Sequence, residues 1–297
     1  MTHFDTRSGF ISIVGRPNVG KSTLVNILVG TKVAITSDRP QTTRNTIRGI
    51  VTVLEKNTQL VLIDTPGIHK PRTELGERLN RLVYGSLAEA DAALFVLDAT
   101  QPIGPGDRRI AERLSSSGVP VVVAVNKVDI ADKEEIIGQL AVAGEWNFAA
   151  YVPISATTAD GIEPLLDELV ALCEPGPFFF PPDATSDQPD QLLAGELIRE
   201  KFLARLREEL PHSLAVVVDE METQDNGVVR IEATAYVERD SQKGMVIGKG
   251  GRIVRDVGTE ARVDLEKLFG ARVFLDLRVI VEKDWQRRSD GLDRLGF

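Results

Sequence analysis

The sequence predicts an α/β protein with two domains, a doubly wound parallel-sheet domain followed by a smaller α+β domain. Over residues 10–173, short apolar runs alternate with longer amphipathic segments, which is typical of a doubly wound fold. Residues 174–191 then hold five prolines and no regular periodicity, which predicts a semi-extended linker. A new set of helical and strand periods follows. We therefore predict one domain at 1–175, a linker at 176–191 and a second domain at 192–297.

The apolar runs of the first domain read as strands. Several are nearly continuous in Val, Ile and Leu, which suits parallel strands covered on both faces. The predicted strands are 10–14, 46–54, 59–64, 92–98, 119–127 and 149–156. The predicted helices between them include 21–30, 105–117 and 162–173. Because 46–54 and 59–64 are joined by only a short turn, we expect that pair to be antiparallel. The Phe run at 178–180 is expected to lie against a domain surface.

The second domain shows its own periods. A first helix carries an apolar residue at every fourth position, a strand alternates over 229–237, a second helix follows a glycine-bearing loop, and a last strand alternates over 273–281. The first helix is marked by Ile198, Phe202, Leu206 and Leu210, and the second by Ile253, Val257, Ala261, Leu265 and Leu268. The polar amphipathic tail at 282–297 is expected to pack on this domain, with a membrane surface as the alternative.

Composition limits the class of protein. A formal charge of −9 argues against indiscriminate coating of nucleic acid but leaves room for a local basic patch. The single cysteine, Cys173, has no partner for an internal disulfide, which indicates a reducing compartment. No stretch approaches the ~20 apolar residues of a membrane span, and an apolar strand begins almost at once, which leaves no room for a signal peptide. We expect a cytoplasmic protein.

Residues 15–22 read GRPNVGKS, a G-x-x-x-x-G-K-[ST] motif between a predicted strand and a predicted helix. Glycines at 15 and 20 let the backbone wrap around phosphate, and the helix N-terminus favours an anion. Lys21 should reach the β and γ phosphates of a nucleotide, and Ser22 should ligate Mg²⁺. The predicted contacts from this motif are Gly15, Asn18, Val19, Gly20, Lys21, Ser22 and Thr23.

The tetrapeptide Asn126-Lys127-Val128-Asp129 selects the base. It follows an apolar strand, where the Asp129 carboxylate can accept hydrogen bonds from N1 and the exocyclic amine of guanine. Adenine lacks this donor pair and would leave the carboxylate unpaired. Asn126 is expected to brace the nucleotide-binding loops, the Lys127 stem to lie over the base, and Ser155-Ala156 to place the Ala156 amide near the guanine O6. The sequence therefore predicts GTP and GDP as ligands.

Two further segments complete the predicted nucleotide site. Asp64-Thr65-Pro66-Gly67 ends a strand, so that Asp64 can hold Mg²⁺ through water and the Gly67 amide can sense the γ-phosphate. The polar loop TSDRPQTTRN supplies a third magnesium ligand, for which we favour Thr43, with Thr42 as the competitor. The residues predicted to serve hydrolysis are Asn18, Lys21, Thr43 and Gly67.

One absence bears on the rate of hydrolysis. Ras and Gα proteins place a water-orienting Gln just after the glycine that corresponds to Gly67, whereas this chain has Ile68. We therefore expect slow intrinsic hydrolysis. Asn18 resembles an asparagine that, in related GTPases, helps to hold K⁺ where an arginine finger would act; a solvated loop residue is the alternative.

The second domain carries a G-x-x-G loop within GMVIGKGGRI, at residues 244–253. Glycines let a nucleic-acid backbone approach closely, and the following helix N-terminus favours phosphate. The helix–strand–strand–loop–helix–strand order matches a prokaryotic (type II) KH domain. The predicted RNA contacts are Lys243, Gly248, Lys249, Gly250, Gly251, Arg252 and Arg255.

Together these motifs form a specific pattern. GRPNVGKS, PQTTR, DTPGI and NKVD followed by VIGKGG resemble the Era family of bacterial GTPases over essentially the whole chain. The resemblance implies a factor for 30S ribosomal subunit assembly whose KH domain grips the 3′ end of 16S rRNA, and it implies peripheral association with the inner membrane. We expect a monomer. One alternative is an RNA chaperone that uses GTP only as a structural ligand, and another is a GTP-regulated signalling protein whose C-terminal domain binds protein or membrane partners.

Overall fold

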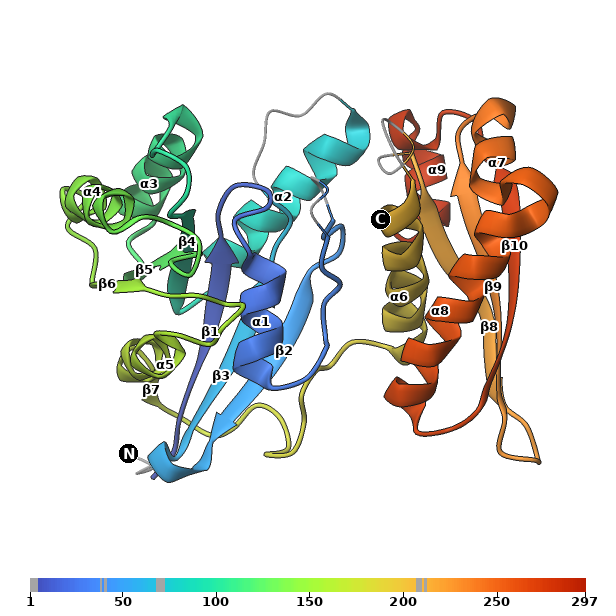
Figure 1. Cartoon of the computed structure of the whole chain (residues 1–297). Helices are drawn as coiled ribbons and strands as arrows, with labels where there is room; N and C mark the ends of the chain where they lie inside the picture. The colour runs from blue at the N-terminus through green and yellow to red at the C-terminus, as the bar shows by residue number, and fades with distance from the viewer. Residues whose placement is uncertain (1–4, 38, 40–41, 68–72, 207–209, 211–212) are drawn as a thin grey trace. The chain divides into compact units, whose positions relative to one another are not determined.

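The computed structural model describes residues 5–37, 39, 42–67, 73–206, 210 and 213–297. The chain divides into two compact units (Figure 1). The first is drawn from 1–34, 40–70 and 78–187, and the second from 35–39, 71–77 and 188–297.

The first unit is built on a mixed sheet with strand order β2-β3-β1-β4-β5-β6, and β7 lies beside β1. The strands are β1 Arg7–Val14, β2 Ile47–Val53, β3 Thr58–Asp64, β4 Ala92–Asp98, β5 Val121–Asn126, β6 Ala150–Pro153 and β7 Glu174–Pro175. As predicted, β2 and β3 are antiparallel. The neighbouring strands from β3 to β6 are parallel, and all residues of β5 are buried.

Helices cover both faces of this sheet (Figure 1). They are α1 Lys21–Val29, α2 Glu74–Ala88, α3 Pro105–Ser117, α4 Lys133–Gly144 and α5 Ile162–Ala171, with a short 3₁₀ turn, η1, at Leu54–Lys56. One core cluster includes Leu24 of α1 and Leu165 of α5. A second cluster includes Val83 of α2 and Ile110 of α3. The doubly wound architecture predicted from the sequence is therefore confirmed, and the loops after β1, β3 and β5 leave the carboxyl edge where such folds bind ligands.

The second unit places two long helices against a three-stranded sheet of order β10-β9-β8. The elements are α6 Asp190–Arg205, β8 Ala215–Thr223, β9 Val229–Val237, α7 Asp240–Ile247, η2 Lys249–Gly251, α8 Arg252–Phe269, β10 Val273–Val281, η3 Trp285–Arg287 and α9 Ser289–Arg294. β8 and β9 are antiparallel, whereas β9 and β10 are parallel. Alternate residues of β9 pack with α6 and α8 into one core.

Three details of the second unit differ from the sequence prediction. The first helix ends at Arg205, because Leu206 turns to an extended backbone (φ −80°, ψ 150°) while its side chain stays buried. Leu210 therefore packs on the core from outside the helix. Leu268 is 37% exposed, since the neighbouring Phe269 packs on the core at the end of α8. The helix α7 was not predicted.

The linker segment at Phe179–Phe180 is bound to the first unit, and the C-terminal tail is bound to the rest of the second unit. The amides of Phe179 and Phe180 donate to Gln59 Oε1 at 2.9 and 3.0 Å, and the Phe179 ring lies 4.7 Å from that of Phe10. The predicted docking of the Phe run is confirmed. In the tail, the buried Trp285 donates from Nε1 to the Ser213 carbonyl at 3.1 Å and stacks on Phe297. Among the described helices, none combines the length and the apolar character needed to cross a membrane.

Candidate nucleotide-binding site and RNA-binding loop

The loop between β1 and α1 holds its lysine through backbone carbonyls of the loop itself. Lys21 is buried, and its Nζ donates to the carbonyls of Gly15 at 3.1 Å and Arg16 at 2.9 Å. Burial lowers the pKa of Lys21 to about 8, although the nearby Asp64 carboxylate acts in the opposite direction. An amine held this way at the start of a helix is well placed to receive a phosphate group, whose negative charge would restore its proton affinity.

Asn126 links three segments of the site. Its Nδ2 donates to the Val19 carbonyl at 2.8 Å, and its Oδ1 accepts from the Ala156 amide at 2.9 Å. Gly20 adopts a left-handed conformation (φ 99°), and a Cβ there would lie 2.2 Å from Asn126 Nδ2. Because this side chain is tied at both ends, it cannot move aside without breaking a hydrogen bond. The structure thus brings together four residues that the sequence assigns to nucleotide binding, Val19, Gly20, Asn126 and Ala156.

Three oxygen-bearing side chains converge beside Lys21. Ser22 Oγ lies 2.7 Å from Asp64 Oδ2 and 2.9 Å from Thr43 Oγ1. Asp64 is fully buried, and among the described residues its Oδ1 has no hydrogen-bond partner. Burial raises the pKa of Asp64, against the opposing effects of Lys21, Ser22 and Thr43. Two hydroxyls and a carboxylate with an unused oxygen are the hard donors that Mg²⁺ prefers, so these residues fit a magnesium ion.

The end of β3 approaches the phosphate-binding loop. A Cβ on Gly67 would lie 2.7 Å from the backbone nitrogen of Pro17, so only glycine allows this contact. Thr65 Oγ1 donates to the Ile13 carbonyl at 2.7 Å and ties the two strands together. Asn18 has a left-handed backbone (φ 64°) within the loop. Ile68, at the position where Ras and Gα proteins have a water-orienting glutamine, lies outside the described residues.

The motif predicted to select the base begins at the buried end of β5 and reaches the surface at Asp129. Asp129 is exposed, and Lys127 has a left-handed backbone (φ 72°) with its Nζ 2.6 Å from Asp98 Oδ2. Ser155 is buried, and its Oγ accepts from the Thr158 amide at 3.1 Å. Asp98 was not among the residues predicted from the sequence. Its signal was weak, because a single acidic residue at the end of a buried strand is common.

The G-x-x-G loop of the second unit is open at its last two glycines, whereas a Cβ on Gly248 would lie 2.7 Å from Ile253 Cγ1. Gly248, Gly250 and Gly251 have positive φ values of 75°, 61° and 73°. A Cβ on Gly250 or Gly251 would meet nothing within 4 Å, so these glycines serve the backbone conformation and leave the loop uncovered. Lys249 is exposed. The loop ends at the N-terminus of α8, where backbone amides favour an anion.

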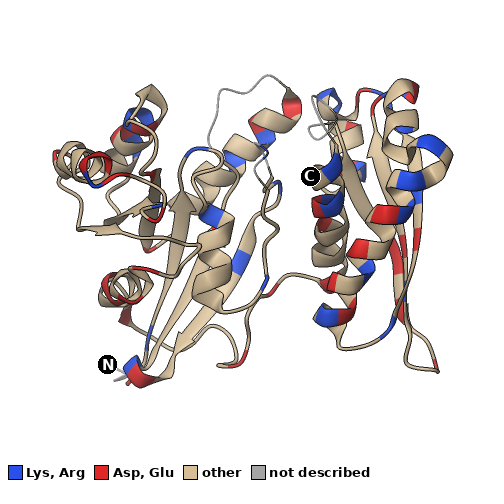
Figure 2. Ribbon diagram, in the orientation of Figure 1, with Lys and Arg blue, Asp and Glu red and all other residues tan. Residues whose placement is uncertain are grey.

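Lys and Arg positions, coloured blue on the ribbon of Figure 2, lie at and near the start of α8. Arg252 is 82% exposed, with Asp256 at 3.7 Å as its ion-pair partner. Arg255 donates to the Gly250 carbonyl at 3.3 Å, and Lys243 on α7 is partly exposed. The residues predicted to contact RNA are therefore gathered around one loop, within a chain that is acidic overall.

Comparison with known proteins assigns both units. Residues 10–127 match the family described as "50S ribosome-binding GTPase", and residues 209–286 match the KH domain family. GTPase Era of Mycobacterium tuberculosis strain H37Rv is 51% identical over 304 residues, covering 100% of both chains. The chain belongs to the Era family of GTPases. GTPase Era of Mycolicibacterium paratuberculosis strain K-10 is 50% identical over 303 residues, again with 100% of both chains covered.

Solved Era structures share the whole fold. A crystal structure of Era in complex with MgGDPNP and nucleotides 1506–1542 of 16S ribosomal RNA has a TM-score of 0.94 at 35% identity, covering 98% of this chain and 99% of that one. Aquifex aeolicus Era, as a variant bound to GDP and AlF₄⁻, has the same TM-score, identity and coverage. The predicted pairing of a P-loop GTPase fold with a KH domain is confirmed.

Proposed function

We propose that this chain is a GTP-hydrolysing switch that binds the 3′ end of 16S rRNA and acts in assembly of the 30S ribosomal subunit. The observation that carries the proposal is full-length similarity to an Era structure that contains both MgGDPNP and nucleotides 1506–1542 of 16S rRNA. The interlocked P-loop and the open G-x-x-G loop of this chain supply one surface for each ligand.

In the proposed nucleotide site, the P-loop binds the phosphates and the segments after β5 and β6 bind guanine. The proposed contacts are Gly15, Asn18, Val19, Gly20, Lys21, Ser22, Thr23, Asp64, Gly67, Asn126, Lys127, Asp129, Ser155 and Ala156. Ser22 and Thr43 would hold Mg²⁺ directly and Asp64 through water. Mg²⁺ neutralises charge on the phosphates when bound. Thr43 is preferred to Thr42 because its hydroxyl lies beside Ser22 Oγ.

The proposed reaction is in-line attack of water on the γ-phosphate. Lys21 stabilises charge that develops on the transferred group, and the Gly67 amide detects whether that group is present. Because position 68 is isoleucine, no side chain there can orient the water, and we expect slow intrinsic turnover. Asn18 stays a candidate for holding K⁺ beside the phosphates.

The proposed RNA contact lies at the start of α8. Exposed lysine and arginine side chains attract phosphate, and the open glycines admit a nucleic-acid backbone. The proposed residues are Lys243, Gly248, Lys249, Gly250, Gly251, Arg252 and Arg255. Peripheral association with the inner face of the cell membrane and a monomeric state stay predictions, the first resting on the family resemblance alone.

The test is binding of a labelled RNA with the 16S 3′ sequence to the full chain, with GTP analogue, with GDP and without nucleotide. We expect the tightest binding with the GTP analogue, and a scrambled RNA of equal length serves as the control. Equal affinity for both RNAs would remove the ribosomal assignment. No RNA binding in any state, with GTP turnover intact, would favour a signalling GTPase with protein or membrane partners.

A further inference from the structure

Two carboxylates flank the segment between β4 and α3, and neither has a role in the site described above. Asp98 ends β4, and Asp107 lies in the first turn of α3. Each carboxylate pairs with a cation from a different nucleotide-binding motif, Lys127 in one case and Arg16 in the other. We name residues 98–107 the β4–α3 segment.

Asp107 holds the side chain of Arg16 from a fixed position. Its Oδ2 lies 3.0 Å from Arg16 Nη1 and also accepts the Gly104 amide at 2.9 Å. Since the Asp107 side chain is only 5% exposed, the helix start sets where its carboxylate lies. The stem of Arg16 runs over Gly106, where a Cβ would lie 3.3 Å from Arg16 Cδ. The guanidinium is thus directed to the start of α3.

The backbone of the same residue holds the catalytic lysine. The Arg16 carbonyl accepts from Lys21 Nζ at 2.9 Å. A change in where Arg16 is held would therefore change where Lys21 is held. Neutralised by Asp107, Arg16 is a poor candidate for a phosphate ligand of its own. Its arrangement is that of an anchor for the loop.

Asp98 makes the corresponding contact with the guanine motif. Its Oδ2 lies 2.6 Å from Lys127 Nζ, and its Oδ1 accepts from the Thr100 amide at 3.0 Å and hydroxyl at 2.6 Å. Burial acts to raise the pKa of Asp98, but hydrogen bonds from Lys127 and Thr100 outweigh it, so the pKa is lowered and the group stays ionised. The Ala99 amide also donates to the Asn126 carbonyl at 2.8 Å.

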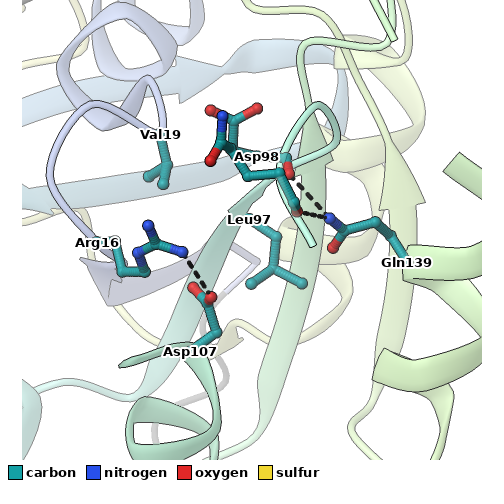
Figure 3. Close-up of a pocket in the computed structure, with 7 residues that line it drawn as sticks. Arg16, Val19, Leu97, Asp98, Asp107 and Gln139 are labelled. Atoms are coloured by element: carbon teal, nitrogen blue, oxygen red, sulfur yellow. Dashed lines mark hydrogen bonds and ion pairs between the residues drawn. The ribbon is translucent and has the colours of Figure 1, made fainter. Parts of the chain in front are cut away.

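The Arg16–Asp107 contact and the Asp98 side of the other contact border one small cavity. Figure 3 shows Arg16, Asp107, Asp98 and Gln139 around it, with Val19 of the phosphate-binding loop on its far wall. Gln139 Nε2 donates to the Asp98 carbonyl at 3.0 Å, so α4 also holds the β4–α3 segment. The segment is therefore fixed to its own helix, to α4 and to both nucleotide-binding motifs.

We propose that Asp98 and Asp107 are positioning residues, which set the phosphate-binding loop and the guanine motif in register for one nucleotide. A purely structural role explains the geometry less well. The Gly104 amide alone would give Asp107 its capping function, and an ion pair with a cation that is 38% exposed adds little stability. The inference rests on the GTP site proposed above.

The first experiment is a double-mutant cycle on the full chain, with Arg16→Ala, Asp107→Asn and both together, measured as the Kd of a fluorescent GDP. Asparagine keeps the capping oxygen and removes the charge. We expect each single change to weaken GDP binding about tenfold and the double change to weaken it no further, because both remove one contact. Arg109→Ala, an exposed arginine of the same helix, should leave the Kd unchanged.

The second experiment measures the affinities of the Asp98→Asn variant for GDP and for inosine diphosphate and compares their ratio with that of the wild type. Inosine lacks the exocyclic amine that Asp129 would bind, so a displaced guanine motif should lower this ratio several-fold, whereas simple loss of stability would leave it unchanged. Thermal unfolding without nucleotide reports folding of each variant, and Arg16→Gln, which also removes the charge, replaces any Arg16→Ala protein that fails to fold.

The outcomes separate the two proposals. If the wild-type chain binds no GDP, the nucleotide site itself is wrong, and this inference falls with it. If wild type binds GDP but the Arg16 and Asp107 effects add, or the variants bind as wild type does, the positioning role alone is overturned. An unchanged ratio in Asp98→Asn overturns the role of Asp98.

Discussion

Two loops of this chain, both proposed to contact phosphate groups, lead into a helix N-terminus and carry glycines, yet they are built in opposite ways. The loop before α1 is interlocked: Lys21 is held by two carbonyls, and Asn126 reaches Val19 and Ala156. The loop before α8 is open, with nothing within 4 Å of a Cβ on Gly250 or Gly251. A change in the first loop should disturb several neighbours at once, whereas a change in the second should act locally, through charge.

The strongest test of this comparison is the substitution Gly20→Ala, which adds one methyl group to the first loop. Gly20→Ala would place Cβ 2.2 Å from Asn126 Nδ2 on a backbone with φ 99°, so the loop or Asn126 must shift. We expect GDP affinity to fall by at least about a hundredfold, because left-handed strain and a lost brace act together. The measurement is titration of the purified chain with GDP.

Gly30→Ala is the matched control for that variant. Gly30 also has a left-handed backbone (φ 80°), but a Cβ there meets nothing within 4 Å. The Gly30→Ala substitution should lower the free energy of unfolding by about 1 kcal/mol and leave the Kd for GDP unchanged. Equal GDP affinity in both variants would show that the first loop relaxes as freely as the second.

The open loop should respond through charge alone. Lys249→Asp combined with Gly250→Asp removes one positive charge and adds two negative ones beside the proposed RNA phosphates. We expect RNA affinity to fall roughly thirtyfold at moderate salt and the Kd for GDP to stay the same, measured by filter binding and nucleotide titration. Asp is tolerated in the left-handed conformation of Gly250 (φ 61°).

The same two changes at the other end of α8 provide the control. Lys267 is exposed, and Gly270 has φ 61° with open space around it, so Lys267→Asp with Gly270→Asp matches the test pair in charge and backbone. Equal loss of RNA affinity in both double variants would mean that net charge, and not the G-x-x-G loop, controls binding.

The buried lysine makes the interlocked loop sensitive to pH. Burial lowers the pKa of Lys21 to about 8 in the free chain, with Asp64 opposing, and a bound phosphate should raise it again. Nucleotide binding must therefore take up a proton above pH 8. GDP affinity should fall about fourfold from pH 7 to pH 8.5, as expected for one linked proton.

Calorimetry in two buffers of different ionisation enthalpy counts that proton. The matched variant is Lys21→Arg, because arginine stays protonated over this range and its profile should be flat. A wild-type affinity independent of pH, with no proton taken up at pH 8.5, would contradict the lowered pKa of Lys21.

The same contrast explains what could be predicted from the sequence. Motifs confined to a few adjacent residues, such as GRPNVGKS and GKGG, predict the kind of ligand directly. The spacing of apolar residues predicted the strands of both units. Thr42 and Thr43 could not be separated, because neighbours in a loop differ only in where the fold directs them. Arg16 and Asp107 are 91 positions apart, so no local pattern connects them.

The apolar periodicity did not predict the end of α6 or the presence of α7. Leu206 and Leu210 continue the four-residue repeat of α6, but the backbone has already left the helix, and both side chains reach the core from outside it. The helix α7 was missed because its sequence, DSQKGMVI, has one buried residue, Val246, and a glycine in its interior. An amphipathic stripe is needed for the period to be visible.

The smallest expected effect tests whether exposure alone separates the two loops. Arg252 is 82% exposed, and its partner Asp256 is 3.7 Å away, so Arg252→Gln should change the free energy of unfolding by less than about 0.5 kcal/mol. Its effect should be confined to RNA. If Arg252 neutralises one phosphate of a single strand, the slope of log K against log salt should become shallower by about 0.7. Arg262→Gln, an exposed arginine farther along α8, should leave the slope unchanged. An altered slope in both variants, or in neither, would remove Arg252 from the RNA contact and leave the loop backbone and Lys249 to carry it.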